Sequence, residues 1–191
     1  MRIVLASASP RRRELLEQAG IDFEILIGST RQCIRKEEPG EIVEELSLAK
    51  AKGVAEAVTG DAVIIGADTI VAKGNKVLGK PKDAEDAHQM LAMLQGEKHQ
   101  VYTGVTLLQK KGDERIIRSF HERTDVFMTS MSDQEIEAYI ATGEPFDKAG
   151  SYGIQGRAGI FVERIEGDYY NVVGLPVSYV YRQLKEIAEK D

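Results

Sequence analysis

The stretch from residue 62 to residue 72 reads AVIIGADTIVA and decides the fold class. Apolar, mostly β-branched residues flank a central GADT, and this pattern predicts a buried strand over 62–72. Gly74-Asn75 follows as a hairpin turn that leads into a second strand over 76–78. A buried strand that continues into a hairpin predicts a sheet with at least one antiparallel pair.

The rest of the chain alternates between strand and helix patterns. Strand patterns cover residues 3–6, 23–27, 99–109, 116–126, 160–165 and 169–173, and the last two are expected to pair around Gly167-Asp168. Helical patterns cover residues 10–19, 39–58, 84–94, a segment that follows an SxxE capping box at 132–135, and 176–189. We therefore expect an α/β fold: a mixed sheet flanked by helices, in two lobes with a central cleft. No linker rich in Pro, Gly or Ser divides the chain, so residues 1–191 are expected to form a single domain.

Composition excludes several classes of protein. Hydrophobic residues make up 42% and charged residues 29%, which is typical of a globular protein and not of a disordered one. The net charge of −6 disfavours broad nucleic-acid binding, and the apolar runs are too short for a membrane span. The first apolar run leads directly into arginines, which argues against a secretory signal, and the one cysteine, Cys33, permits no internal disulfide. We expect a cytoplasmic protein without nucleic-acid or membrane partners.

Residues 7–15 read SASPRRREL and place three arginines at the start of a helix. A helix N-terminus carries partial positive charge, so bare cations are unfavourable there. The same terminus favours an anion, and small residues before it allow a ligand to approach. Because guanidinium groups bind phosphate in a bidentate manner, Arg11 and Arg12 predict a phosphate site. The alternative is that the arginines face solvent and pair with acids such as Glu14; Arg13 has no assigned role.

Asp68 stands in the middle of the apolar strand at 62–72. A buried carboxylate is costly unless it is paired or binds a metal, so Asp68 is a candidate general base or metal ligand. Gly66 and Ala67 before it are expected to leave room for a ligand. The alternative is a structural aspartate that accepts hydrogen bonds from loop amides. Lys50 and Lys80 are each compatible with a surface charge, but together with the arginines they predict a cationic clamp for a triphosphate.

A third segment, residues 144–156, reads EPFDKAGSYGIQG. It combines opposite charges, glycines and the amide of Gln155, which offers both a donor and an acceptor to the edge of a base. A solvated turn region is the alternative. Apolar residues between the charges favour a partly buried loop.

These motifs together resemble one family. SASPRRREL, GADT, LGKP, EPFDKAGSYGIQG and GDYYNVVGLP are similar, in the same order, to the motifs of the Maf family of nucleoside triphosphate pyrophosphatases. The resemblance runs from about residue 3 to residue 185. The string DKAGSYGIQG is similar to the branch that acts on dTTP and UTP, whereas the branch that acts on 7-methyl-GTP typically lacks it.

The resemblance implies cleavage between the α- and β-phosphates, which yields a nucleoside monophosphate and pyrophosphate, with help from Mg²⁺ or Mn²⁺. Asp68 matches the family's proposed proton acceptor. Positions that match the family's phosphate-binding motif are Ser7, Arg11, Arg12, Lys50 and Lys80, and positions linked to substrate choice are Arg11, Thr69 and Gln155. Members of the family are often homodimers. Their presumed role is house-cleaning, the removal of noncanonical pyrimidine nucleotides. The metal ligands stay unassigned.

One segment departs from the family pattern. Family members usually carry an acidic pair soon after the second strand, but residues 28–33 read GSTRQC and contain no carboxylate. Glu37 or Glu38 could take over that role. Two alternatives remain: a 7-methyl-GTP pyrophosphatase, and a nucleotide-binding regulator of septum formation with little catalysis.

Overall fold

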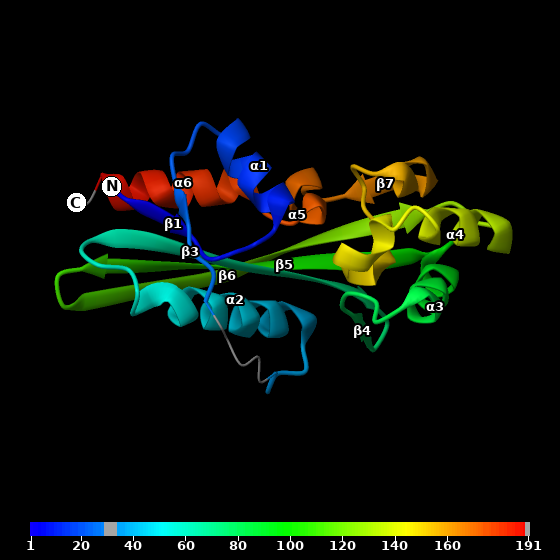
Figure 1. Ribbon diagram of the computed structural model, residues 1–191, viewed down its shortest axis with the longest axis horizontal. Helices are drawn as coiled ribbons and strands as arrows, with labels where there is room; N and C mark the ends of the chain where they lie inside the picture. Colours follow the sequence, from blue (N-terminus) through cyan, green and yellow to red (C-terminus); the bar gives the residue numbers. More distant parts are fainter. Residues whose placement is uncertain (29–33, 190–191) are drawn as a thin grey trace. The chain divides into compact units, whose positions relative to one another are not determined.

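A computed structural model describes residues 1–28 and 34–189, and its strands form one mixed sheet (Figure 1). The strands are β1 (Ile3–Leu5), β2 (Glu24–Ile25), β3 (Ala62–Lys73), β4 (Lys76–Leu78), β5 (Lys98–Lys111), β6 (Glu114–Met128) and β7 (Val162–Glu166). Their order is β2-β1-β3-β5-β6-β7, and β4 pairs with β3. β1 is parallel to both β2 and β3, whereas the β3–β4 and β6–β7 pairs are antiparallel. The predicted mixed sheet and the hairpin after β3 are confirmed.

Helices occupy most of the segments with helical patterns. They are α1 (Pro10–Gln18), α2 (Pro39–Ala55), α3 (Ala84–Leu94), α4 (Asp133–Ile140), α5 (Tyr169–Val173) and α6 (Val177–Ala188). Three 3₁₀ segments, η1 (Glu144–Asp147), η2 (Ala149–Ser151) and η3 (Arg157–Phe161), lie between α4 and β7. The predicted capping box is present at the start of α4, where Ser132 and Glu135 each accept the backbone N–H of the other.

The chain divides into two compact units. The first unit comprises Met1–Asp68, Thr103–Glu122 and Gly174–Asp191, and the second comprises Thr69–Tyr102 and Arg123–Val173. β3, β5 and β6 therefore each begin in one unit and end in the other. The two units agree with the two predicted lobes, and the cleft stays a prediction.

In the first unit, α2 and α6 cover opposite faces of the sheet (Figure 1). The backbone of α2 lies directly against two strands, because a Cβ at Gly66 would come within 2.2 Å of the Ser47 carbonyl oxygen and one at Gly104 within 2.2 Å of the Val43 carbonyl. The space beside Gly66 is thus filled by a helix. The expectation that Gly66 leaves room for a ligand is wrong.

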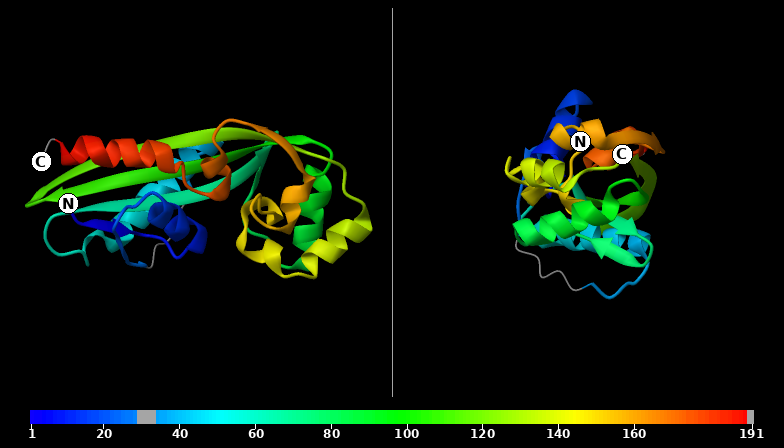
Figure 2. Two further views of the ribbon diagram at one scale, coloured as in Figure 1. Left: turned by 90° about the horizontal axis from the view of Figure 1, so that it is seen from above. Right: turned by 90° about the vertical axis from the view of Figure 1, so that its right-hand side faces the viewer.

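The second unit has its own core. α3 packs against α4 and against η2 (Figure 2), and apolar side chains from these elements and from the strands form one buried cluster. His99 and Tyr152 are buried in this unit as a polar pair, with 2.7 Å between His99 Nε2 and the Tyr152 hydroxyl.

Residues 169–173 form a helix and not the predicted strand. The backbone N–H of Tyr170 donates to Asp168 Oδ1 at 2.8 Å, and the N–H of Val172 donates to the Asp168 carbonyl at 3.4 Å. Asp168 therefore starts a helical turn, as aspartate often does, in place of the expected hairpin. The predicted partner strand, β7, pairs instead with β6, where Glu166 lies opposite Asp125.

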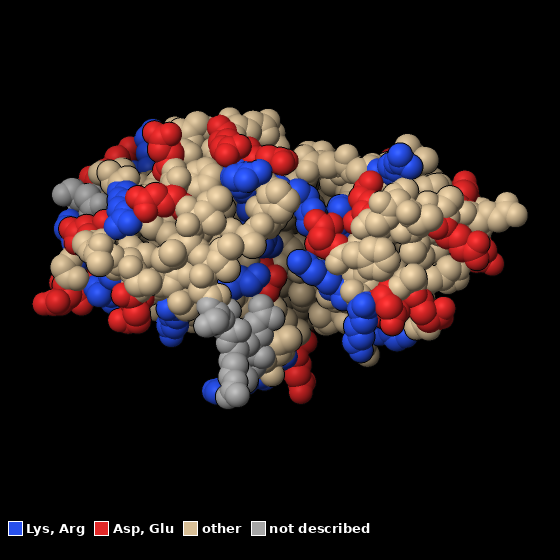
Figure 3. Space-filling model, in the orientation of Figure 1, with Lys and Arg blue, Asp and Glu red and all other residues tan. Residues whose placement is uncertain are grey.

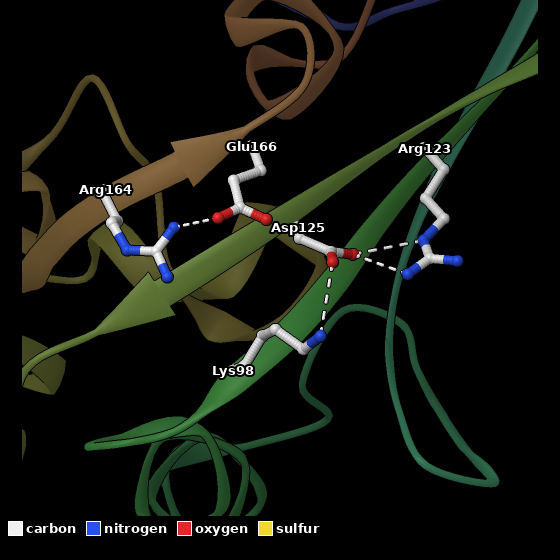
Figure 4. Close-up of polar contacts among 5 residues, drawn as sticks. All are labelled: Lys98, Arg123, Asp125, Arg164 and Glu166. Atoms are coloured by element: carbon white, nitrogen blue, oxygen red, sulfur yellow. Dashed lines mark hydrogen bonds and ion pairs between the residues drawn. The ribbon is translucent and has the colours of Figure 1, made fainter.

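Charged side chains line the β5–β6–β7 part of the second unit (Figure 4). Asp125 accepts hydrogen bonds from Arg123 at 2.9 Å and from Lys98 at 3.4 Å, and Arg164 pairs with Glu166. Burial raises the pKa of Asp125, but the Arg123 hydrogen bond and the charges of Arg123 and Lys98 outweigh it and lower that pKa overall. Asp125 and Glu166 therefore each have a cationic partner.

Acidic and basic side chains are interspersed on the face shown in Figure 3. Within residues 1–28 and 34–189, no helix is both long enough and apolar enough to cross a membrane.

Candidate active site

The loop between β1 and α1 brings Ser7 and Arg12 together. β1 runs parallel to β3, and the N–H of Ala6 donates to the Ile65 carbonyl at 2.8 Å, so the loop leaves the sheet beside the segment that carries Asp68. Ser7 is buried, and its Oγ accepts from the Ser9 N–H and from Arg12 Nη1, both at 3.2 Å. The side chain of Ser7 thereby helps to shape its own loop.

Arg12 is a buried cation, with 7% of its surface exposed. Its Nε donates to the Gly174 carbonyl at 2.8 Å, which ties α1 to the segment before α6. Burial lowers the pKa of Arg12, while the nearby charge of Asp68 opposes this effect and that of Arg11 adds to it. Arg12 therefore lies within electrostatic reach of Asp68, and its predicted contact with phosphate stays a prediction.

The other two arginines of α1 differ in environment. Arg11 is half-buried, whereas Arg13 is exposed and lies 3.8 Å from Glu17 one turn further along the helix. For Arg13, the solvent-facing alternative is correct. The first turn of α1 contains no acidic residue, and Ser9 makes no side-chain capping bond. The N-terminal field of α1 is thus not offset by an acid in its own first turn, a setting that favours an anionic ligand.

Lys50 and Asp68 form an ion pair. The close packing of α2 on β3 at Gly66 brings Lys50 Nζ within 3.1 Å of Asp68 Oδ1 and 3.2 Å of the Ala67 carbonyl oxygen. Both side chains are largely but not fully buried, with 23% and 18% of their surface exposed. Asp68 is thus a carboxylate in the middle of a strand that is paired with a cation and still reachable from solvent.

Three predicted residues belong to the second unit. Thr69 directly follows Asp68 in β3, and Lys80 is exposed just after β4. The segment before Gln155 packs on the same hairpin, because the Gly150 N–H donates to the Gly79 carbonyl at 3.0 Å and a Cβ at Gly150 would come within 2.8 Å of Val71.

Gln155 occupies a tight turn. The Gly156 N–H donates to the Gly153 carbonyl at 3.1 Å, and Gln155 itself is exposed. Ser151 and Tyr152 are buried, so the predicted partly buried loop is confirmed. Glu144 has no role predicted from the sequence, and its carboxylate lies against Gly156. The only sequence signal for that contact is the pair of glycines around Ile154 and Gln155.

No group of three or more His, Cys, Asp or Glu side chains within the described residues could hold a metal ion. Mg²⁺ commonly uses only one or two protein carboxylates and takes its remaining ligands from substrate phosphates and water. The carboxylate of Asp68 is partly exposed and pairs with Lys50 through Oδ1, so it fits that kind of site as one protein ligand beside the substrate phosphates.

The segment that departs from the family pattern lies mostly outside the described residues, which omit 29–33 and therefore Cys33. Glu37 and Glu38 are described and exposed, just before α2. Whether either replaces the missing acid stays a prediction.

Comparison with known proteins shows the family. The model of the Maf family, described as Maf-like protein, matches residues 2–187. The chain belongs to the Maf family. A relative from Agathobacter rectalis is 49% identical over 97% of each protein. Relatives from Bacillus cytotoxicus and Bacillus cereus are 49% and 50% identical over 97% of this chain and 95% of theirs. All three are named dTTP/UTP pyrophosphatase.

Among solved structures, the Ham1 protein of Staphylococcus aureus aligns with a TM-score of 0.45 at 13% identity and covers 68% of this chain and 72% of its own. The Maf-family match extends over all five motifs of the sequence analysis, so the family resemblance is confirmed.

Proposed function

We propose that this protein is a dTTP/UTP pyrophosphatase, which hydrolyses these nucleotides to the nucleoside monophosphate and pyrophosphate. The observation that carries the proposal is the similarity to Maf relatives with that name, which are 49–50% identical over 97% of this chain. The ion pair of Lys50 and Asp68, with Arg12 in electrostatic reach, supplies chemistry that suits the reaction.

In this mechanism, Asp68 accepts a proton from a water molecule, and the water oxygen attacks the α-phosphorus. The bond between the α-phosphorus and the bridging oxygen breaks, and pyrophosphate leaves with that oxygen. Lys50 Nζ, at 3.1 Å from Asp68 Oδ1, fixes the direction of the carboxylate, which then orients and deprotonates the water.

The cationic residues bind the triphosphate. Negative charge grows on phosphoryl and leaving-group oxygens during the attack, and preorganised guanidinium and ammonium groups stabilise it. In our proposal, Arg11 and the N-terminus of α1 contact phosphate together with Lys80. Ser7 and Arg12 shape this loop through their mutual hydrogen bond and also face the phosphates.

A divalent cation, Mg²⁺ or Mn²⁺, would be held by Asp68 together with phosphate oxygens of the substrate. When bound, such an ion supplies Lewis-acid stabilisation of the phosphoryl oxygens. Thr69 and Gln155 are proposed to select the base, and the amide of Gln155 suits the donor and acceptor edge of thymine or uracil.

The domain organisation, compartment and cellular role are proposed from the same family. We propose that residues 1–191 act as one domain, as a cytoplasmic enzyme that clears noncanonical pyrimidine nucleotides. A homodimer is its proposed assembly.

Product identification tests the proposal. The protein is incubated with dTTP or UTP and Mg²⁺ in ¹⁸O-labelled water. The products are then separated, and their masses and ¹⁸O content are measured by mass spectrometry. We expect pyrophosphate and a monophosphate that carries the label. Asp68→Asn should lower kcat by roughly 10²- to 10⁴-fold, the usual contribution of a general base. Asp61→Asn changes an exposed aspartate just before β3; it is the matched control and should retain activity.

Release of orthophosphate, or full activity in Asp68→Asn, would exclude the proposed chemistry. A panel that includes 7-methyl-GTP distinguishes the two branches of the family. Nucleotide binding without turnover under either metal would favour the regulator of septum formation.

A further inference from the structure

The carboxylate of Glu144 lies beneath the turn that carries Gln155. Its Oε1 accepts from the Tyr139 hydroxyl at 3.0 Å, and its Oε2 accepts from the Arg157 N–H at 3.1 Å. One oxygen is therefore bound to α4 and the other to the chain two residues after Gln155. Glu144 therefore links the turn to α4.

Gly156 shows how closely the carboxylate fits. A Cβ at this position would come within 1.8 Å of Glu144 Oε1, and its three nearest atoms all belong to that carboxylate. The backbone of Gly156 has φ −98° and ψ −162°, which other residues adopt without a positive φ. A glycine is needed here because Glu144 occupies the place of a side chain.

Lys148 completes the support on the other side of the turn. Its Nζ donates to the Glu144 carbonyl and to Asp147 Oδ1, each at 2.7 Å, and its Cε lies 2.5 Å from where a Cβ of Gly153 would stand. The turn from Gly153 to Gly156 thus rests on two side chains that are themselves held by hydrogen bonds.

Tyr139 is a fixed donor to this carboxylate. Burial first, and then the hydrogen bond to Glu144, raise the pKa of Tyr139 above its ordinary value. The hydroxyl therefore keeps its proton at neutral pH, and its hydrogen bond holds Glu144 in one orientation.

We propose that Glu144 is a positioning residue for base selection: it fixes the turn from Gly153 to Gly156 and thereby the direction of the Gln155 amide. The inference rests on the proposed function, in which Gln155 contacts the base. An amide must be held in place to discriminate between bases, because a mobile one can satisfy several hydrogen-bonding patterns.

The first test compares Glu144→Ala with Glu144→Gln on dTTP, UTP and a set of other nucleoside triphosphates. We expect Glu144→Ala to raise KM for dTTP and UTP about 10-fold or more with a smaller change in kcat, and to reduce the preference for them. Glu144→Gln keeps one acceptor oxygen and should restore part of that preference. An unchanged preference in Glu144→Ala overturns the proposal.

A double-mutant cycle tests the contact with Gly156. Gly156→Ala should reduce base preference in the wild-type background, because its Cβ displaces the Glu144 carboxylate. In the Glu144→Ala background it should cause little further loss, because its nearest neighbours are gone. Independent losses that simply add would contradict the proposed contact.

Glu135→Ala is the control for a merely structural effect. Glu135 is exposed in the same unit and forms the capping box of α4, so its loss lowers stability without touching the turn. Its base preference should equal that of the wild type. An equal loss of preference in Glu135→Ala would show that general destabilisation explains the effect.

Amide hydrogen exchange gives a readout that does not need activity. In Glu144→Ala the Arg157 amide loses its acceptor, so its exchange should become at least 10-fold faster, while amides in α3 keep their rates. Unchanged exchange at Arg157 overturns the inference whatever the enzyme does. If Gln155→Ala loses base preference but Glu144→Ala does not, the proposed function stands and this inference fails. If the wild type shows no preference for dTTP and UTP, the proposed function fails instead.

Discussion

His99 should make the stability of this protein fall in mild acid. The residue has no exposed surface, its Nε2 lies 2.7 Å from the Tyr152 hydroxyl, and Nδ1 has no hydrogen-bond partner within the described residues. Burial, and next the charge of Lys73, lower the pKa of His99 to about 4, while Asp125 acts in the opposite direction. The folded protein therefore holds a neutral imidazole at pH values where an unfolded chain would protonate it.

The magnitude follows from the two pKa values. The unfolded value is about 6.5, so the unfolded chain binds about one more proton than the folded protein between pH 6.5 and pH 4. The contribution of His99 is therefore present above pH 6.5 and lost as the pH falls. The free energy of unfolding should decrease by about 2 kcal/mol between pH 7.5 and pH 5, and by about 3 kcal/mol once the pH is well below 4.

Urea unfolding of the wild type and of His99→Gln, measured at several pH values between 7.5 and 5, tests this prediction. The chain has no tryptophan but seven tyrosines, so tyrosine fluorescence and circular dichroism serve as probes. His99→Gln lowers stability at pH 7.5 but should lose about 2 kcal/mol less than the wild type on acidification. The paired carboxylates titrate in both proteins, so the difference between them isolates His99.

Equal pH dependence in both proteins would refute the reasoning. A direct check is available because the chain has only three histidines, whose ring protons can be followed by NMR. A His99 resonance that titrates near pH 6.5 in the folded protein would show that burial does not suppress its protonation.

Two further predictions concern the first unit. Gly66→Ala should lower the free energy of unfolding by about 1–3 kcal/mol, because the new Cβ meets the α2 backbone at 2.2 Å. It should also reduce activity, because the shift of α2 moves Lys50 away from Asp68. Gly79→Ala is the stability control, since its Cβ would have no described atom within 4 Å apart from its chain neighbours, and an unaltered Tm for Gly66→Ala would contradict the packing. Nucleotide at about 100 times its Kd should stabilise the wild type by about 2.7 kcal/mol and so raise its Tm, as measured by differential scanning fluorimetry. Arg11→Ala should reduce that rise in Tm. An equal rise in both proteins would exclude Arg11 from the site.

Most of the fold could be predicted from the sequence, because its signals are local. The apolar run of β3 and the stripe of α2 depend on spacing within one element, and both elements were correctly located. The error at 169–173 arose because YYNVV also has the composition of a strand. The side chain of Asp168 decides in favour of a helix by accepting the Tyr170 N–H, a contact that composition does not reveal.

The candidate site was predictable in part. The burial of Arg12 could have been found from helical spacing, because Arg12, Leu15 and Leu16 share one face of α1 and all three are buried. The pairing of Lys50 with Asp68 could not, because it depends on how a helix crosses a strand. The family motifs named both residues without showing that they touch.

Two glycines of this protein are required for a steric reason that the sequence alone does not reveal. Glycine usually suggests a turn or a backbone with positive φ, yet Gly66 and Gly156 lie outside the positive-φ group. Each is required because another group takes the place of its side chain, the backbone of α2 at Gly66 and the carboxylate of Glu144 at Gly156. In each case the close contact belongs to a part of the fold that positions a proposed functional group. At Gly66 it is the helix that carries Lys50 beside Asp68, and at Gly156 it is the carboxylate that holds the turn with Gln155. Such glycines therefore mark where the fold holds its chemistry in place, and substitution at either position is the most direct test of that arrangement.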